Sequence, residues 1–132
     1  MMTLVLKQFG SKTVLALGCL ALGVGGSAAE LSDAAKVEFF DNKILPILKA
    51  QCFKCHGAKQ KLKGEFRVTN RASLLKGGES GAIFVAGDPK KSRIIEAVRY
   101  NNPDLQMPPK SKLTDKQISD LVEWINRGAP WP

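Results

Sequence analysis

A helical pattern of hydrophobic positions is clearest near the C-terminal end of the chain. Four apolar residues recur there at intervals of three or four positions, as on one helix face: Ile118, Leu121, Val122 and Ile125. Thr114 with Gln117 three residues later forms a capping box, and Gly128 and Pro130 stop the pattern. The sequence therefore predicts an amphipathic helix between these two signals.

A second helix is predicted after residue 31, where Ser32 can serve as its N-cap. Its apolar positions follow a roughly helical period: Val37, Phe39, Phe40, Ile44 and Leu45. Pro46 cannot donate a helix hydrogen bond and disfavours helix in the residue before it. We expect a break or kink at this proline, with a new turn that continues into Cys52.

The middle of the chain predicts shorter elements. The stretch GEFRVTN favours a short extended piece, and Asn70 can cap a short helix that holds two leucines. Asp88 as N-cap and Pro89 at the first helical position predict a helix that reaches about Tyr100. In total we expect an all-α domain of about four helices with long loops.

Residues 1–29 differ from the rest because they have the pattern of an export signal. A basic start with Lys7 and Lys12 precedes an apolar run from 13 to 26, and small residues lead to a cleavage point after Ala29. The apolar run is shorter than the roughly 20 residues that span a bilayer. We therefore expect an exported, periplasmic protein whose domain comprises residues 30–132.

Two alternatives for this N-terminal segment stay open. It could be kept as a membrane anchor, or Cys19 in ALGC could carry a lipid. Without Lys7 and Lys12, the remaining 18 Lys and Arg face 12 Asp and Glu, a net charge of +6. That balance favours acidic partners, whereas the absence of basic runs interleaved with aromatic residues argues against nucleic-acid binding.

The motif CFKCH, residues 52–56, carries the candidate chemistry. Structural zinc needs four Cys or His ligands, and the chain beyond residue 29 offers only Cys52, Cys55 and His56. A redox CxxC belongs to a βαβ pattern that is not found here. A plain Cys52–Cys55 disulfide remains possible in an oxidising compartment, but it leaves His56 without a role.

Cys-x-x-Cys-His is the attachment signature of a c-type haem. Each thiol adds to one vinyl group of the porphyrin, and the histidine that follows faces the iron. One motif predicts one haem c, attached through Cys52 and Cys55 with His56 as an iron ligand. The second axial ligand cannot be histidine, because the chain has only one.

Met107 is the candidate for that second ligand. It lies in the proline-flanked stretch LQMPPK, where no periodic core face needs a methionine. A thioether stabilises ferrous over ferric iron and suits electron transfer, and six-coordinate iron has no position for a substrate. We therefore expect a one-electron carrier and not an enzyme.

Three stretches carry a resemblance to a known family: ILPILKAQCFKCHG, LLKGGESGAIFVAGDPKKSRIIEAV and LQMPPKSKLTDKQISDLVEWINRGAPWP. The chain resembles the planctomycete-type cytochrome c domain over about residues 36–132. The resemblance implies a class I cytochrome c-like fold, with His56 as proximal and Met107 as distal ligand. The family's GLRLD appears here as GEFRVT, and its PGDP as AGDP.

The resemblance also implies that the first and last helices cross beside the haem. Four aromatic residues are candidates to contact it: Phe53, Tyr100, Trp124 and Trp131. Three arginines could pair with its propionates: Arg67, Arg71 and Arg99. Four lysines lie in or just after the motif and belong either to a solvated loop or to a docking site for an acidic redox partner: Lys54, Lys59, Lys61 and Lys63.

Three hypotheses for function follow. The first is a monomeric electron carrier that uses a redox partner protein and no small-molecule substrate. The second is a haem-based sensor or ligand-binding module in which Met107 dissociates from the iron. The third is a binding module without haem, held by a Cys52–Cys55 disulfide.

Overall fold

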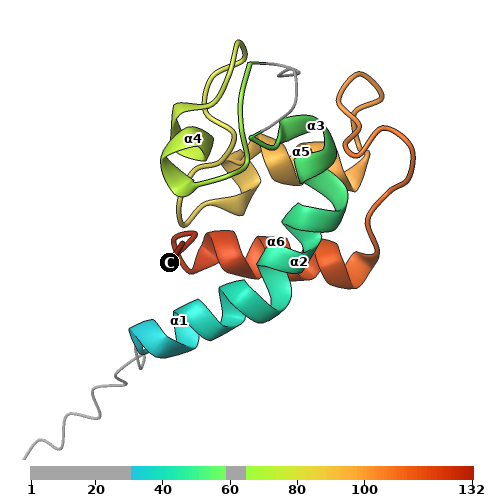
Figure 1. Cartoon of the computed structure of the whole chain (residues 1–132). Coiled ribbons are helices and arrows are strands. Elements are labelled where there is room, and N and C mark those ends of the chain that lie inside the picture. Colours follow the sequence, from blue (N-terminus) through green and yellow to red (C-terminus); the bar gives the residue numbers. More distant parts are fainter. Residues whose placement is uncertain (1–30, 59–64) are drawn as a thin grey trace, which may run out of the picture.

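The computed structural model describes residues 31–58 and 65–132 (Figure 1). Within these ranges the chain forms helices and loops and no strand, as the all-α prediction requires, with two isolated bridges in the loops. No helix in the described ranges has the length and apolar character needed to cross a membrane. The predicted export signal and Lys59, Lys61 and Lys63 lie outside the described residues.

A bent helical column forms the N-terminal part of the fold. Its consecutive segments are α1 (Asp33–Phe39), η1 (Phe40–Ile44), α2 (Leu45–Ile47), η2 (Leu48–Cys52) and α3 (Phe53–His56). The Ser32 hydroxyl accepts a hydrogen bond from the Ala35 N–H at 3.3 Å, so the predicted N-cap is confirmed.

Pro46 does not break this column. The residues around it keep helical backbone angles, and wider π-helical turns lie on both sides in η1 and η2. A π turn relaxes the spacing that would otherwise bring the proline ring against a carbonyl one turn earlier. The column bends between α1 and α3 and delivers Cys52 to its far end (Figure 1).

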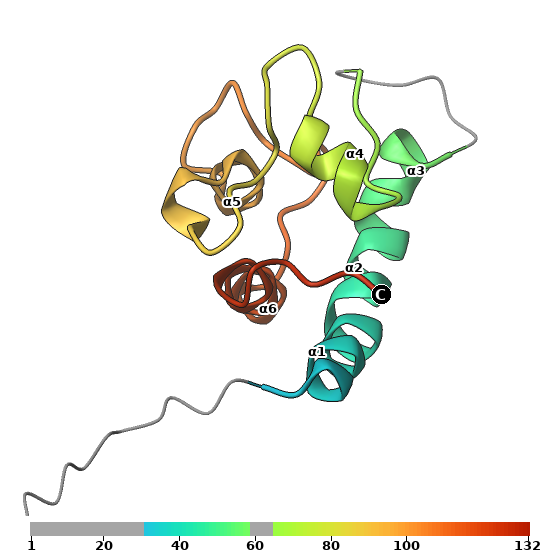
Figure 2. The same ribbon diagram turned by 90° about the vertical axis from the view of Figure 1, so that its left-hand side faces the viewer.

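The last helix, α6 (Asp115–Asn126), crosses the column, as both views show (Figures 1 and 2). Its capping box is present as predicted: the Thr114 hydroxyl accepts from the Gln117 N–H at 3.2 Å, and the Gln117 side chain accepts from the Thr114 N–H at 3.0 Å. The position of α6 across the column confirms that the first and last helices cross.

Trp124 of α6 stands at the centre of the core with none of its surface exposed. It packs against Phe40 of the column, against Phe84 and against Trp131 near the C-terminus. Its indole N–H donates to the Pro130 carbonyl at 2.8 Å, which satisfies the buried polar atom. The aromatic cluster thus locks the C-terminal tail to the crossing of α6 and the column.

Two shorter helices complete the fold. Helix α4 (Arg71–Lys76) has the predicted Asn70 cap, whose side chain accepts from the Ser73 N–H at 2.8 Å. Residues 65–70, predicted to be extended, form an irregular turn and no strand.

The helix expected from Pro89 starts later than predicted. Asp88 caps only the 3-10 turn η3 (Pro89–Lys91), and α5 (Arg93–Arg99) begins after Ser92. The buried Ser92 hydroxyl accepts from the Val85 N–H at 2.9 Å and donates to the Asp88 carbonyl at 2.8 Å. These local bonds compete with a continuous helix and set its start four residues downstream.

Candidate functional site

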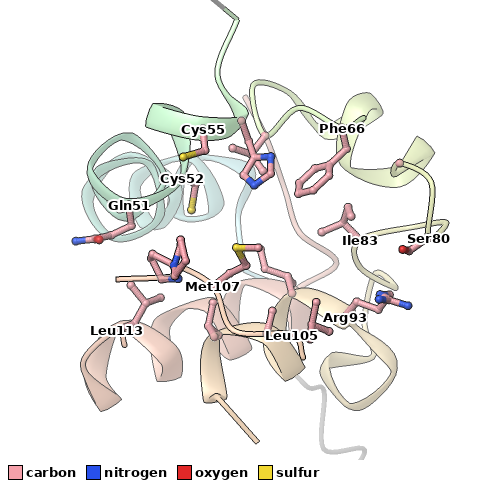
Figure 3. A pocket seen from close by; sticks show the side chains of 18 residues that line it. Gln51, Cys52, Cys55, Phe66, Ser80, Ile83, Arg93, Leu105, Met107 and Leu113 are labelled. Carbon is pink, nitrogen blue, oxygen red and sulfur yellow. The ribbon is translucent and has the colours of Figure 1, made fainter. Parts of the chain in front are cut away.

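A cavity of about 410 Å³ opens between the end of the helical column, α5 and the loop that follows α5 (Figure 3). This volume lies within the roughly 300–1,000 Å³ typical of ligand and cofactor sites. Its wall is mostly apolar, with Phe66, Val68, Ile83, Ile94, Ala97, Val98, Leu105 and Leu113. All four residues predicted for the haem site line it: Cys52, Cys55, His56 and Met107.

The two cysteines come from the end of the column, Cys52 from η2 and Cys55 from α3. Both are half-buried, both are free thiols, and their sulfurs point into the cavity from one side (Figure 3). Burial raises the pKa of the Cys52 thiol to about 11, so this group is protonated at neutral pH. The Cys52–Cys55 disulfide of the third hypothesis is therefore not formed in this structure.

His56 ends helix α3 and is buried, with 8% of its surface exposed. The ring of Phe66 stacks on the imidazole, with centroids 4.1 Å apart and planes inclined by 22°. The His56 carbonyl accepts from the Val68 N–H at 3.0 Å, which brings the Phe66 segment back across the motif. A side chain added at Gly57 would meet the Phe53 carbonyl at 2.4 Å, so glycine is required directly after the histidine.

Met107 reaches the cavity from the opposite wall, more than fifty residues along the chain from the cysteines (Figure 3). We call residues 105–109 the methionine loop. The Met107 N–H donates to the Ala97 carbonyl of α5 at 3.1 Å, and 41% of the methionine surface is exposed. The fold therefore brings the two thiols, the imidazole and the thioether to one cavity.

The aromatic residues expected at the site do not line the cavity. Trp124 and Trp131 belong to the core, Phe53 packs against the edge of that core, and the Tyr100 hydroxyl donates to the Pro108 carbonyl behind the methionine loop. Phe66 is the aromatic residue in the cavity wall. It lies in the GEFRVT stretch, whose irregular backbone offered no period from which its direction could be predicted.

The three arginines proposed for the propionates are also placed elsewhere. Arg67 donates to the carbonyls of Gly57 at 2.9 Å and Ala58 at 2.7 Å. Arg71 donates to the carbonyls of Ala129 and Gly128, both at 3.1 Å, and Arg99 does not line the cavity. The first two arginines tie backbone segments together, since carbonyl groups that end a helix need donors.

Arg93 is the arginine at the cavity. It lies at the start of α5 with Ser80 nearby, on the side of the cavity away from Cys52 and Cys55 (Figure 3). Among the described residues no hydrogen bond or ion pair engages its guanidinium. The sequence could not single it out, because its position depended on where α5 begins.

Residues 52–111 match the family model described as planctomycete cytochrome C. The matched segment contains the CxxCH motif and Met107. Residues 52–111 thus belong to a planctomycete-type cytochrome c domain. No curated protein and no solved structure gives a significant match. The resemblance noted from the sequence is therefore confirmed over residues 52–111, together with the all-α, cytochrome c-like fold.

Cytochrome c domains bind haem c covalently and typically carry electrons, and the site fits that cofactor. The fit rests on the donor set, because the cavity presents two free thiols on one side, a buried imidazole beside them and a thioether opposite. The apolar walls of the cavity suit the faces of a porphyrin. They would also lower the dielectric constant around its iron. The family match and the donor set together indicate a haem-binding electron-carrier domain.

Proposed function

We propose that the protein is an exported monohaem c-type cytochrome that acts as a one-electron carrier. Cys52 and Cys55 hold the haem by thioether bonds, and His56 and Met107 are the axial ligands of its iron. The observation that carries this proposal is the meeting of four donor side chains, from segments far apart in the sequence, in one apolar cavity. Side chains that only pack in an apolar wall need not be two free thiols.

The bound haem supplies one-electron exchange between ferric and ferrous iron. Met107 gives it a neutral, soft ligand, which favours the ferrous state and raises the reduction potential. His56 is kept in place by the stacked Phe66 ring and by burial. With His56 and Met107 both bound to the iron, no coordination position would remain for a substrate.

Thioether bonds to Cys52 and Cys55 would fix one orientation of the haem in this cavity. Its vinyl edge would face the two cysteines, and its propionates would be on the opposite side. Arg93 and Ser80 line the side of the cavity away from the cysteines. Arg93 therefore replaces the arginines predicted from the sequence as the partner of a propionate, through a charge-assisted hydrogen bond.

The partner is a redox protein with an acidic docking face, and the carrier works as a monomer without a small-molecule substrate or nucleic acid. Exposed Lys54 lies within the haem motif, and exposed Lys110 and Lys112 follow the methionine loop. Electron transfer needs only a small and brief interface, which complementary charge can steer. Lys59, Lys61 and Lys63, which follow the motif in the sequence, carry charge of the same sign.

A haem-based sensor is the second candidate, because Met107 comes from a loop and not from a helix. In that function the methionine leaves the iron and a diatomic gas takes its place. The carrier requires Met107 to remain bound in both oxidation states. Affinity of the reduced iron for carbon monoxide distinguishes the two functions.

Two variants test the proposed ligands in protein matured with haem. Met107→Ala should lower the potential, by about 59 mV for each tenfold loss of ferrous preference, and should let carbon monoxide bind the reduced iron. His56→Ala should abolish the low-spin spectrum even where haem stays attached. An unchanged potential in Met107→Ala, or a native spectrum in His56→Ala, would contradict the proposed ligation.

A further inference from the structure

Two hydrogen bonds to the protein frame hold the backbone of the methionine loop. The Met107 N–H donates to the Ala97 carbonyl in α5 at 3.1 Å. The Tyr100 hydroxyl donates to the carbonyl of Pro108, the next residue along the loop. The two bonds flank the Met107 side chain, which reaches into the cavity between them (Figure 3).

Met107 lies in a loop, outside any helix or strand, and its side chain is unbranched and flexible. The place of its sulfur therefore depends on where the loop backbone is held. Of the two bonds, the one from Tyr100 is made by a side chain and can be removed by substitution.

The backbone of Tyr100 is itself unusual. It caps the end of α5 with φ 62° and ψ 25°, the left-handed conformation that glycine or asparagine adopts at helix ends with little cost. A bulky residue is strained there, and such strain persists where the surrounding structure requires that side chain. Ending the helix does not require tyrosine, whereas reaching the Pro108 carbonyl does.

We propose that Tyr100 is a positioning residue for the axial thioether, which it holds toward the iron by fixing the Pro108 carbonyl. This inference rests on the proposed ligation by Met107. The Tyr100 side chain does not line the cavity, so Tyr100 acts on the haem site only through the methionine loop. Without the hydroxyl the loop opens more easily, and an external ligand competes better for the iron.

Binding of imidazole to the ferric, haem-loaded protein measures this competition. Tyr100→Phe keeps the ring and removes only the hydroxyl. We expect imidazole to bind about 2- to 10-fold more tightly than to wild type, the effect of one neutral hydrogen bond. The near-infrared charge-transfer band of the thioether-ligated ferric iron should weaken as well. Tyr100→Gly, which relieves the backbone strain but also lacks the hydroxyl, should show the same gain in imidazole affinity.

Glu65→Gly is the matched control. Glu65 is a second residue with left-handed backbone, φ 56°, and it lies outside the methionine loop. This variant should leave imidazole affinity unchanged, which separates relief of strain from loss of the hydroxyl. Met107→Ala gives the reference for complete loss of the thioether.

The outcomes separate the two proposals. If Met107→Ala tightens imidazole binding and Tyr100→Phe binds it as wild type does, the role of Tyr100 is wrong and the ligation stands. If Met107→Ala itself leaves imidazole affinity unchanged, the thioether is not the ligand and both proposals fail. A gain in Tyr100→Phe equal to that in Glu65→Gly would also refute the positioning role.

Discussion

Phe66 stacks on the imidazole of His56, with ring centroids 4.1 Å apart and ring planes inclined by 22°. Such an arrangement limits rotation of the imidazole about its side-chain bonds. Burial of the histidine and the bond from the Val68 N–H to its carbonyl act in the same direction. The plane of this proposed ligand is therefore set by a neighbour that the motif itself does not contain.

Phe66→Leu tests this restraint. The leucine keeps the cavity wall apolar but cannot stack, so the imidazole should take up a wider range of orientations. We expect broader or shifted low-spin signals in the electron paramagnetic resonance spectrum of the ferric protein, and a loss of about 0.5–1.5 kcal/mol of stability. Phe53→Leu, outside the cavity, should leave the signals as they are; equal spectra for wild type and Phe66→Leu would show that the stack does not orient the ligand.

Arg93 provides a test of haem orientation. Arg93→Gln removes a positive charge from the side of the cavity assigned to the propionates, which should lower the potential because ferric iron is then less disfavoured. The pKa of the propionate should rise, so the pH-dependent part of the potential moves to higher pH. Arg99→Gln, at the other end of the same helix, is the matched control. A larger effect from Arg99 than from Arg93 would reverse the assignment.

Glu65 offers a gain in stability. Its left-handed backbone, φ 56°, costs a residue with a side chain roughly 1–2 kcal/mol, and part of this is recovered when glycine replaces it. Glu65→Gly should therefore raise the free energy of unfolding by up to about 1 kcal/mol, measured by thermal melting of the haem-loaded protein. A lower melting temperature would mean that the glutamate side chain makes a contribution larger than the strain.

The charge near the methionine loop should control the rate of electron exchange. Lys110→Glu with Lys112→Glu should slow reaction with an anionic metal-complex oxidant and speed reaction with a cationic one. Exposed charges are screened over about 10 Å at 0.1 M salt, so both effects should shrink as salt rises.

The matched control changes the net charge by the same amount in the N-terminal half of the helical column, with Lys36→Glu in α1 and Lys43→Glu in η1. If both double variants alter the rates equally, only total charge matters and no docking face lies beside the loop. The potential and the absorption spectrum should stay close to wild type in both.

Local signals in the sequence predicted much of this fold. The capping box of Thr114, the Asn70 cap and the period of α6 are contacts between residues a few positions apart, and the structure contains each of them. The start of α5 was missed because Ser92 bonds to Val85, a loop residue whose approach no helical pattern reveals.

The candidate site shows the same limit. Cys52, Cys55, His56 and Met107 were identified by residue type, and the fold brings all four to one cavity. The wall around them was not predictable, since Phe66 and Arg93 lie on irregular backbone or at an element boundary. The donor residues could therefore be predicted from the sequence, whereas the neighbours that orient them could be identified only from the tertiary structure.

The most direct test of the carrier proposal is the absorption spectrum of the reduced wild-type protein, matured with haem, before and after addition of carbon monoxide. Ligation by both His56 and Met107 predicts a six-coordinate, low-spin ferrous spectrum that carbon monoxide leaves essentially unchanged. Ready formation of a carbon monoxide complex at low gas concentration would contradict it, because the methionine would then leave the reduced iron as a sensor requires.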